Sequence, residues 1–210
     1  MSKKHLEKLL DFSHCNSKEN VLNHAQIVAI ELMNNWKIVS LKGERRFWGL
    51  EFYLTIPRVF ADSATHEREE QFEKGTFYFH TKSKGGWTPP IFNRHGVDIT
   101  CGNKDRGIYG GILLRHLGGE GHRDGSGLAL RSLVRGDQGF RPIKRGDLNS
   151  KWSKDEISFF HRVNNNSIFN DEMFLQHNPL PEKIEIESVK RVGIEKTNFS
   201  EELLGFRRKK

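Results

Sequence analysis

Apolar residues in the first part of the chain recur at steps of three and four, the spacing of one face of an α-helix. The pattern predicts a helix over residues 18–33, opened by the capping pair Asn16 and Glu19 and ended by two asparagines. Residues 1–15 form a short amphipathic lead before it. A serine cap followed by acidic residues predicts another helix over residues 153–163.

Much of the remaining chain has the pattern of β-strands, with short apolar or alternating runs between glycine, proline and polar turns. Strands are predicted at residues 36–41, 47–54, 75–80, 96–101 and 109–114, with a last strand or strand pair within 184–194. The first two form a hairpin, and the nearly all-apolar 109–114 is expected at the centre of the sheet. Residues 56–73 suggest loop or partial helix, 164–181 suggest loop, and 128–147 show no clear order. The mixture predicts an α+β fold around an antiparallel or mixed sheet.

The second predicted strand carries the first sign of chemistry. Because side chains alternate along a strand, one face is expected to be apolar and to consist of Trp48, Leu50, Phe52 and Leu54. Gly49, Glu51 and Tyr53 fall on the other face. Pattern alone favours a half-buried strand that shows Glu51 and Tyr53 to solvent. The alternative is a carboxylate on a rigid element beside an aromatic ring, which suits a general base next to a stacking surface.

The composition fits one folded domain and excludes several classes of protein. The chain has 210 residues, 35% of them hydrophobic, and its 15 phenylalanines and four tryptophans supply core material that disordered chains lack. No apolar run approaches the roughly 20 residues that cross a bilayer, and the N-terminus lacks a secretory-signal pattern. Cys15 and Cys101 are too few for a disulfide framework or a thiolate zinc site, and Cys101 is expected in the core. A cytoplasmic location is expected.

Positive charge is concentrated at one end of the chain. The formal net charge is +7, and residues 207–210 contribute four of the seven charges. A basic excess favours polyanions such as nucleic acid, but a basic tail often serves only solubility, which weakens that inference. The chain is accordingly divided into the lead 1–15, a domain of residues 16–206 and a basic tail 207–210.

A glycine-rich tract after residues 109–114 carries side chains that are able to bind a metal, namely His116, Glu120, His122 and Asp124. A divalent ion is one interpretation, but polar loops often hold such residues without a metal, and we favour a solvated loop. The glycines have neither Walker nor dinucleotide spacing. No metal is expected.

Seven segments, taken in order along the chain, resemble the motifs of the methylpurine-DNA glycosylase family, the alkyladenine or 3-methyladenine DNA glycosylases. They are VAIELMNNWKIV, LEFYL, DSATH, GTFYFH, HGVDITC, YGGILLRHL and RVGIEK, and they extend from about residue 27 to residue 207. No single motif is specific, and the resemblance depends on their collinear order. It implies a single domain with a curved sheet and flanking helices. It also implies a cofactor-free monomer that acts on double-stranded DNA containing a damaged purine, in the cytoplasm or at the nucleoid.

The resemblance further implies a reaction and roles for individual residues. Enzymes of this family rotate a damaged purine nucleotide out of the duplex and cleave its N-glycosidic bond, which begins base excision repair. Glu51 aligns with the acid that activates water, and Arg115 aligns with an arginine beside the water and the sugar-phosphate. Tyr53 and His66 align with the rings that sandwich the extruded base.

Several positions depart from the family pattern. His80 stands in place of a pocket tyrosine, His95 in place of the tyrosine that wedges into the vacated stack, and Gly102 in place of an asparagine that screens purines. Residues 81–94 look inserted, and residues 141–144 substitute poorly for a DNA-facing segment. Two alternatives therefore stay open. One is a non-catalytic nucleic-acid-binding member of the same fold, and the other is a hydrolase of a small nucleoside or another N-glycoside.

Overall fold

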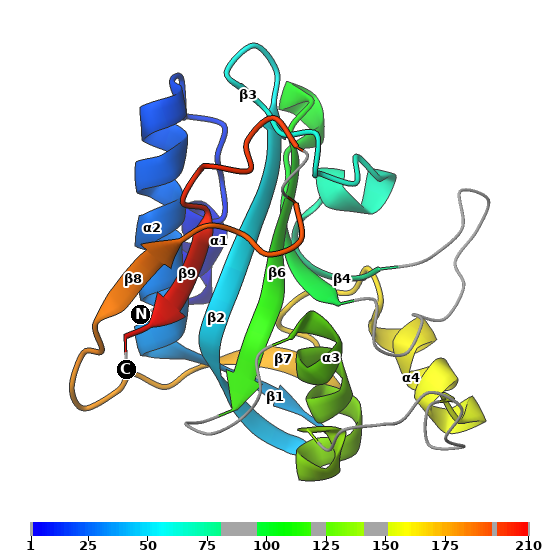
Figure 1. Ribbon diagram of the computed structural model, residues 1–210. Helices are drawn as coiled ribbons and strands as arrows, with labels where there is room; N and C mark the ends of the chain where they lie inside the picture. The colour runs from blue at the N-terminus through cyan, green and yellow to red at the C-terminus, as the bar shows by residue number, and fades with distance from the viewer. Residues whose placement is uncertain (1, 81–95, 119–124, 141–150, 195–196, 210) are drawn as a thin grey trace.

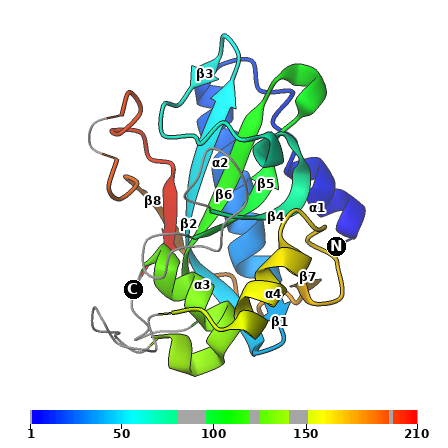
Figure 2. The same ribbon diagram turned by 90° about the vertical axis from the view of Figure 1, so that its right-hand side faces the viewer.

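Antiparallel pairing between strands dominates the architecture (Figures 1 and 2). The computed structural model describes residues 2–80, 96–118, 125–140, 151–194 and 197–209. Within these ranges nine strands form one curled sheet in the order β4-β5-β6-β2-β1-β7, with β3 and β9 added to β2, and β8 paired with β9. The strands are β1 (Trp36–Ser40), β2 (Gly43–Ile56), β3 (Phe60–Ala61), β4 (Lys74–Phe79), β5 (Val97–Cys101), β6 (Tyr109–Gly118), β7 (Met173–His177), β8 (Ile186–Val189) and β9 (Gly205–Arg208).

Helices flank this sheet and complete the α+β class that the sequence predicts. The α-helices of the described residues are α1 (Lys3–Leu9), α2 (Lys18–Asn35), α3 (Ser126–Arg135) and α4 (Lys154–Val163). Short 3₁₀ helices lie at η1 (Glu69–Phe72), η2 (Lys104–Arg106) and η3 (Gly136–Phe140). None of the helices in the described ranges is both long and apolar enough to cross a membrane.

Both predicted helices form, and their caps explain their ends. Ser17 caps α2, one residue after the expected Asn16, because its hydroxyl accepts the N–H of Asn20. The helix runs to Asn35, two residues past the prediction, and the side-chain amides of Asn34 and Asn35 donate to groups one turn earlier. Ser153 caps α4 in a reciprocal capping box with a glutamate three residues later, as the sequence pattern predicts.

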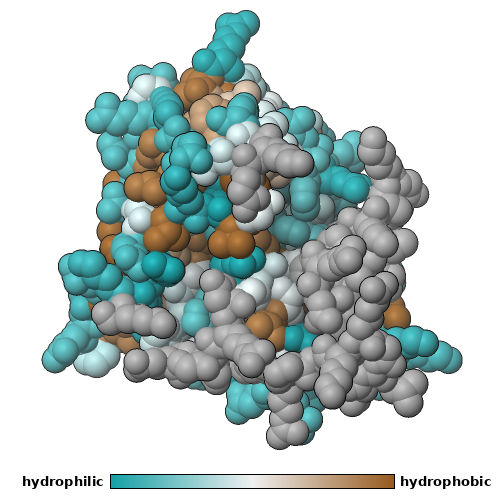
Figure 3. All heavy atoms as spheres, in the orientation of Figure 1, coloured by the Kyte–Doolittle hydropathy of each residue, from teal (hydrophilic) through white to brown (hydrophobic). Residues whose placement is uncertain are grey.

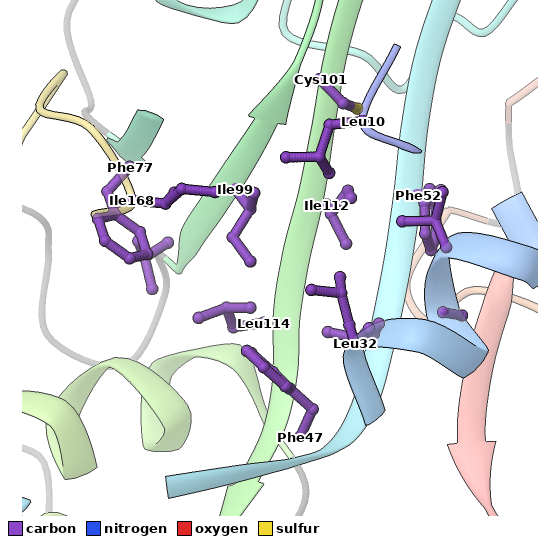
Figure 4. Close-up of a cluster of buried hydrophobic side chains, with 14 of the residues drawn as sticks. Leu10, Leu32, Phe47, Phe52, Phe77, Ile99, Cys101, Ile112, Leu114 and Ile168 are labelled. Carbon is purple, nitrogen blue, oxygen red and sulfur yellow. The ribbon is translucent and has the colours of Figure 1, made fainter. Parts of the chain in front are cut away.

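One face of the sheet is apolar and packs against α1 and α2 (Figure 4). Leu10, directly after α1, and Leu32 of α2 meet Phe52, Ile112 and other fully buried side chains of the strands. Burial of such side chains stabilises a domain by about 1.5–3 kcal/mol each. The central position of β6, between β5 and β2, agrees with the prediction from its apolar run.

The predicted alternation along β2 fails at Trp48. The β2–β6 register pairs Phe47 with Leu117 and Leu50 with Leu114, and the shift between them leaves Trp48 on one strand and Arg115 on the other without a directly opposite partner. This is a β-bulge, which re-aims side chains and bends a strand. Phe47 therefore takes the buried place expected for Trp48, which is only partly buried.

The hydrophobic pattern of the sequence did not predict α3 or β7, because polar residues interrupt the apolar positions of both segments. Helix α3 contains the buried Arg131, which blurs its apolar face, and β7 lies within the segment expected to be loop. The last strand pair is split, because β8 falls within residues 184–194 but its partner β9 lies at the C-terminus. Antiparallel partners that are distant in sequence give no local signal.

The prediction of a basic tail is wrong for residues 207 and 208, which belong to β9. Arg207 forms an ion pair with Glu187, and Lys209 forms one with Glu185. Arg208 donates to the Phe47 carbonyl at 3.1 Å, and burial, with a smaller contribution from a neighbouring arginine, lowers the pKa of Arg208 to about 10. These cations form ion pairs and hydrogen bonds within the sheet. Their number is therefore a poor guide to the affinity of the protein for nucleic acid.

The surface seen from the side of Figure 1 is largely hydrophilic, with apolar residues visible between the polar ones (Figure 3). The large apolar side chains exposed in the described residues are Ile27, Ile30, Leu41, Val192 and Leu203. They lie on α2, in the β1–β2 turn and between β8 and β9. Apolar side chains scattered in this way are normal on a protein surface.

Gly102 is glycine because the chain packs too closely for any side chain. A Cβ at this position would overlap the backbone carbonyl of Gln71 and lie 2.8 Å from the carbonyl oxygen of Ile108. The asparagine that the family resemblance places here is therefore excluded by packing of η1 against the β5–β6 connection.

We expect Gly102→Ala to lower the free energy of unfolding by about 3 kcal/mol or more, since backbone atoms must move to admit the methyl group. Urea unfolding followed by circular dichroism measures the loss. Gly193→Ala is the matched control, because Gly193 has a φ of +80° and no neighbour near its Cβ position. It should cost only about 1–2 kcal/mol for the left-handed backbone. Equal losses in the two variants would contradict the packing argument.

Candidate active site

The β2–β6 bulge brings Glu51 and Arg115 together on the face of the sheet opposite the apolar core. Glu51 lies on β2 opposite Leu113 of β6, and Arg115 follows two residues later on β6. The Nε of Arg115 lies 3.6 Å from Glu51 Oε1, and the side chain of Glu51 is 4% exposed. Gly49 permits this arrangement, because a Cβ there would lie 3.1 Å from the Cβ of His116. The two residues predicted to be catalytic are thus in contact.

Both oxygens of the Glu51 carboxylate accept hydrogen bonds from the protein. The hydroxyl of Tyr53 donates to Oε2 at 2.8 Å, and the backbone N–H of Val192 donates to Oε1 at 3.0 Å. Burial and then the neighbouring Glu51 raise the pKa of Tyr53 well above 10. The phenol therefore stays protonated and acts as a donor at neutral pH. These bonds hold the carboxylate in one orientation.

Arg191 anchors the segment that supplies the Val192 N–H. Its guanidinium is fully buried, forms an ion pair with the equally buried Asp62, and donates to the carbonyls of Phe52 at 2.9 Å and Phe199 at 3.2 Å. It also lies over the ring of Tyr53, with Cζ 4.8 Å from the centroid. One guanidinium thus fixes both the ring and the backbone that contact Glu51.

The loop after β3 and the segment before β9 contact each other around this ion pair. Phe60 and Phe199 stack with centroids 4.0 Å apart, and the side chain of Asn198 bonds to Ser63 and to the Ala61 carbonyl. Asp62 begins the segment DSATH and Arg191 begins RVGIEK, so two of the collinear motifs meet in space. No local pattern around Asp62 or Arg191 predicts that the two would be buried together.

A second group of polar side chains forms around His80. The Nε2 of His80 lies 2.7 Å from Oδ1 of Asp98, which is almost fully buried on β5. The ring of the exposed His66 meets that of His80 with centroids 4.6 Å apart, and Tyr78 packs beside both. His66 and His80, both assigned to the base-stacking pocket by the resemblance, are therefore neighbours, and each also packs beside Tyr78.

Cross-strand register places the two groups on the same face of the sheet. Glu51 is opposite Leu113, Leu113 is opposite Asp98, and Asp98 is opposite Tyr78. Directly opposite residues project to one face, and neighbouring strands lie about 4.8 Å apart, so the backbones at Glu51 and Asp98 are separated by about 10 Å. We call the residues Glu51, Tyr53, His80, Asp98 and Arg115 the site face.

The structure does not describe several of the candidates named from the sequence. His95, Glu120, His122 and Asp124 fall outside the described residues. Within the described residues, no group of three or more His, Cys, Asp or Glu side chains is arranged to hold a metal ion. Burial raises the pKa of Cys15 to about 11 and that of Cys101 well above 9, so both thiols stay protonated and belong to the core.

Asp98, Asp62 and Val192 were missed as site residues by the sequence reasoning. Asp98 carries a usable signal, because it is the one acidic residue in the otherwise apolar or small run GVDITC. A carboxylate inside a buried strand needs a specific partner.

In comparisons with known proteins, no family model matches this chain and no curated protein matches it.

We expect Arg191→Met to lower the free energy of unfolding by about 3–5 kcal/mol, because it leaves the charge of Asp62 buried without its partner. The control is Arg162→Met, which removes an exposed ion pair with Glu172 and should leave the free energy of unfolding almost unchanged. Urea unfolding at neutral pH measures both. A loss at Arg191 as small as that at Arg162 would contradict the anchoring role.

Alkaline titration should show that Tyr53 and Tyr78 stay protonated until the protein unfolds. Burial raises the pKa of each above 10 in the folded state, for Tyr78 with a further contribution from Asp98. Unfolded tyrosine ionises near pH 10, so the stability that they contribute is complete below that pH and is lost as the pH rises above it. Phenolate absorbance at 295 nm and circular dichroism should change together above pH 10. Tyr53→Phe should make the loss of stability less steep, and phenolate formation by all three tyrosines in folded protein would contradict the assignment.

Proposed function

We propose that the protein is a DNA glycosylase-like hydrolase that excises a modified, alkylated purine from duplex DNA, as in the first step of base excision repair. The observation that supports this most directly is the Glu51 carboxylate held by Tyr53 and Val192 beside Arg115. A carboxylate with fixed orientation and a neighbouring cation suits activation of a water for attack on the sugar C1′. The resemblance of the collinear motifs to those of the glycosylase family suggests the substrate class, a modified purine in duplex DNA.

In this mechanism Glu51 accepts a proton from water as the oxygen attacks C1′ and the N-glycosidic bond breaks. The negative charge of the carboxylate offsets the positive charge that develops on the sugar. Arg115 binds a phosphate oxygen of the flipped nucleotide or fixes the carboxylate, since a guanidinium suits both tasks. The rigid β2 and β6 strands keep both side chains in place.

The rings of the site are assigned to the extruded base. Arg191 covers one face of the Tyr53 ring, so a base stacks on the opposite face. The exposed ring of His66 is the second stacking surface. Base–aromatic stacking contributes about 1–3 kcal/mol per base.

Two observations favour the alternatives of a nucleic-acid-binding protein without activity and of a small-nucleoside hydrolase. Glu51 is almost fully buried and both of its oxygens already accept protein hydrogen bonds, as in a purely structural carboxylate. The cations of β9 are paired with glutamates or buried, which reduces the positive charge available to a duplex.

We expect the wild-type protein to release free base from methylated duplex DNA and Glu51→Gln to reduce the rate by about 10²–10⁴-fold. Glutamine keeps the size of the side chain, its oxygen can accept from the Val192 N–H and its amide can donate to the Tyr53 hydroxyl, so the fold should persist. The matched control, Glu7→Gln, changes an exposed glutamate on α1 and should release base at the wild-type rate. Base release is measured by chromatography and abasic sites by alkaline strand cleavage.

Equal rates for wild type and Glu51→Gln would overturn the assignment of Glu51. Salt-sensitive DNA binding without base release would instead support the non-catalytic alternative, because phosphate contacts weaken with salt. Release of base from free nucleosides but not from duplex DNA would identify a small-nucleoside hydrolase.

A further inference from the structure

The hydroxyl of Tyr78 is a buried polar group that has no hydrogen-bond partner among the described residues. We propose that this hydroxyl donates a hydrogen bond to the carbonyl oxygen of a 6-oxopurine base extruded from DNA, which makes Tyr78 a specificity-determining residue. The inference rests on the proposed function and deepens it. It names the class of base that the site favours, namely hypoxanthine and modified guanines over purines that lack the carbonyl group.

The side chain of Tyr78 is almost completely enclosed by the fold. It is 1% exposed, and no described residue lies within hydrogen-bond reach of its hydroxyl. Asp98, its directly opposite neighbour on β5, is bonded elsewhere, with Oδ1 2.7 Å from His80 Nε2 and Oδ2 accepting from Gln71 at 3.4 Å. A buried donor without an acceptor destabilises the free protein, and native structures contain few of them. Such a donor indicates a ligand or an ordered water that completes it.

A second buried hydroxyl in the same region also lacks a partner within the described part of the chain. It belongs to Thr65, which is 8% exposed and directly precedes His66 in the loop after β3. Tyr78 packs against the ring of His66, with centroids 6.3 Å apart and the rings edge to face. Two unsatisfied hydroxyls are thus neighbours of His66, one along the chain and one in space. A polar ligand beside His66 would satisfy groups that the fold does not.

Cross-strand register places Tyr78 on the same face of the sheet as Glu51. Tyr78 is directly opposite Asp98, and Asp98 is opposite Leu113. Leu113 is in turn opposite Glu51, so the backbones at the two ends of this row are about 14 Å apart at the usual strand spacing. With the sugar C1′ beside Glu51, the base extends along the row toward Tyr78. Position 6 lies on the six-membered ring of a purine, away from the nitrogen that bears the sugar.

A tyrosine in this environment is a hydrogen-bond donor at neutral pH. Burial, with a further contribution from Asp98, raises the pKa of Tyr78 well above 10, so the phenol keeps its hydrogen. The carbonyl oxygen of a 6-oxopurine accepts a hydrogen bond, whereas a hydrogen atom at position 6 does not. A site that is built to bond a polar group discriminates against an analogue without that group, because the buried donor then stays unpaired.

Access to the hydroxyl requires a shift of side chains when the base binds. The hydroxyl of Tyr78 is covered in the free protein, whereas the neighbouring His66 is exposed. Changes of side-chain rotamer at an interface are common on binding, even where the backbone stays in place. Rotation of the His66 ring is therefore part of the proposal, and it lets the base enter between this ring and Tyr78.

The test compares two duplex oligonucleotides, one containing a single hypoxanthine and the other an unsubstituted purine at the same position. We expect Tyr78→Phe to lower kcat/KM for hypoxanthine release by about tenfold, the value of one neutral hydrogen bond, and that for purine release by less than about twofold. The two bases leave at different intrinsic rates, but comparing the effect of one substitution on both cancels that difference. Base release is measured by chromatography.

Thermal unfolding gives a second readout that does not depend on activity. Tyr78→Phe removes a hydroxyl that has no partner in the described part of the free protein, so we expect Tm to stay unchanged or to rise. The matched control is Tyr109→Phe, which removes the hydroxyl of a ring stacked on Phe72 with centroids 3.9 Å apart. This control should release both bases at wild-type rates.

Equal slowing of both bases in Tyr78→Phe, or slowing of neither, would overturn the assignment of Tyr78. A marked fall in Tm would also overturn it, because the hydroxyl would then have a partner in the free protein. If the wild-type protein releases bases from methylated duplex DNA but neither hypoxanthine nor purine, the specificity fails and the proposed glycosylase function stands. If it releases no base from any of the three DNAs, both proposals fail together.

Discussion

A charge that cannot reach solvent organises the part of the protein around Glu51. Arg191 is buried, and a guanidinium in a protein interior must be neutralised and hydrogen-bonded or the fold is penalised by several kcal/mol. Asp62 supplies the charge, and the carbonyls of Phe52 and Phe199 supply further acceptors. To satisfy one side chain the chain must bring together β2, the loop after β3 and the segment before β9. Two of these segments, β2 and the one before β9, carry Glu51, Tyr53 and the Val192 N–H.

The curled sheet carries the apolar core on one face and buried polar side chains on the other. Apolar side chains from alternate positions of β2, β6 and β5 pack against α1 and α2, while the intervening positions carry Glu51, Tyr53 and Asp98. The β-bulge at Trp48 and Arg115 shifts the alternation of side chains along β2 and β6. As a result Phe47 and Leu117 point into the apolar core beyond the bulge. Each carboxylate on the site face has a donor in contact, which makes its burial tolerable.

Local sequence patterns predicted those helices and strands that short-range features of the sequence determine. The α2 and α4 helices, the β1–β2 hairpin and the central β6 follow from periodicity, caps and turn residues. The bulge and the β8–β9 pairing depend on which strands become neighbours, and no window of the sequence contains that information. The same limit applies to the site. Strand alternation drew attention to Glu51 and Tyr53, and the resemblance between motifs added Arg115 and the proposed roles. The partnerships of Asp62 with Arg191 and of Asp98 with His80 required the fold.

The β9 cations show why the placement of charge matters more than its sum. A count of +7 with four positive charges at the end of the chain suggests an exposed polycationic tail. Instead, Arg207 and Lys209 pair with Glu187 and Glu185, and Arg208 lies over Trp48 with Cζ 4.6 Å from the ring centroid. A cation already neutralised within the fold releases few counterions from DNA when a complex forms. Attraction for a polyanion would therefore depend more on other lysines and arginines, and Arg115, close to Glu51 on the site face, is one of them.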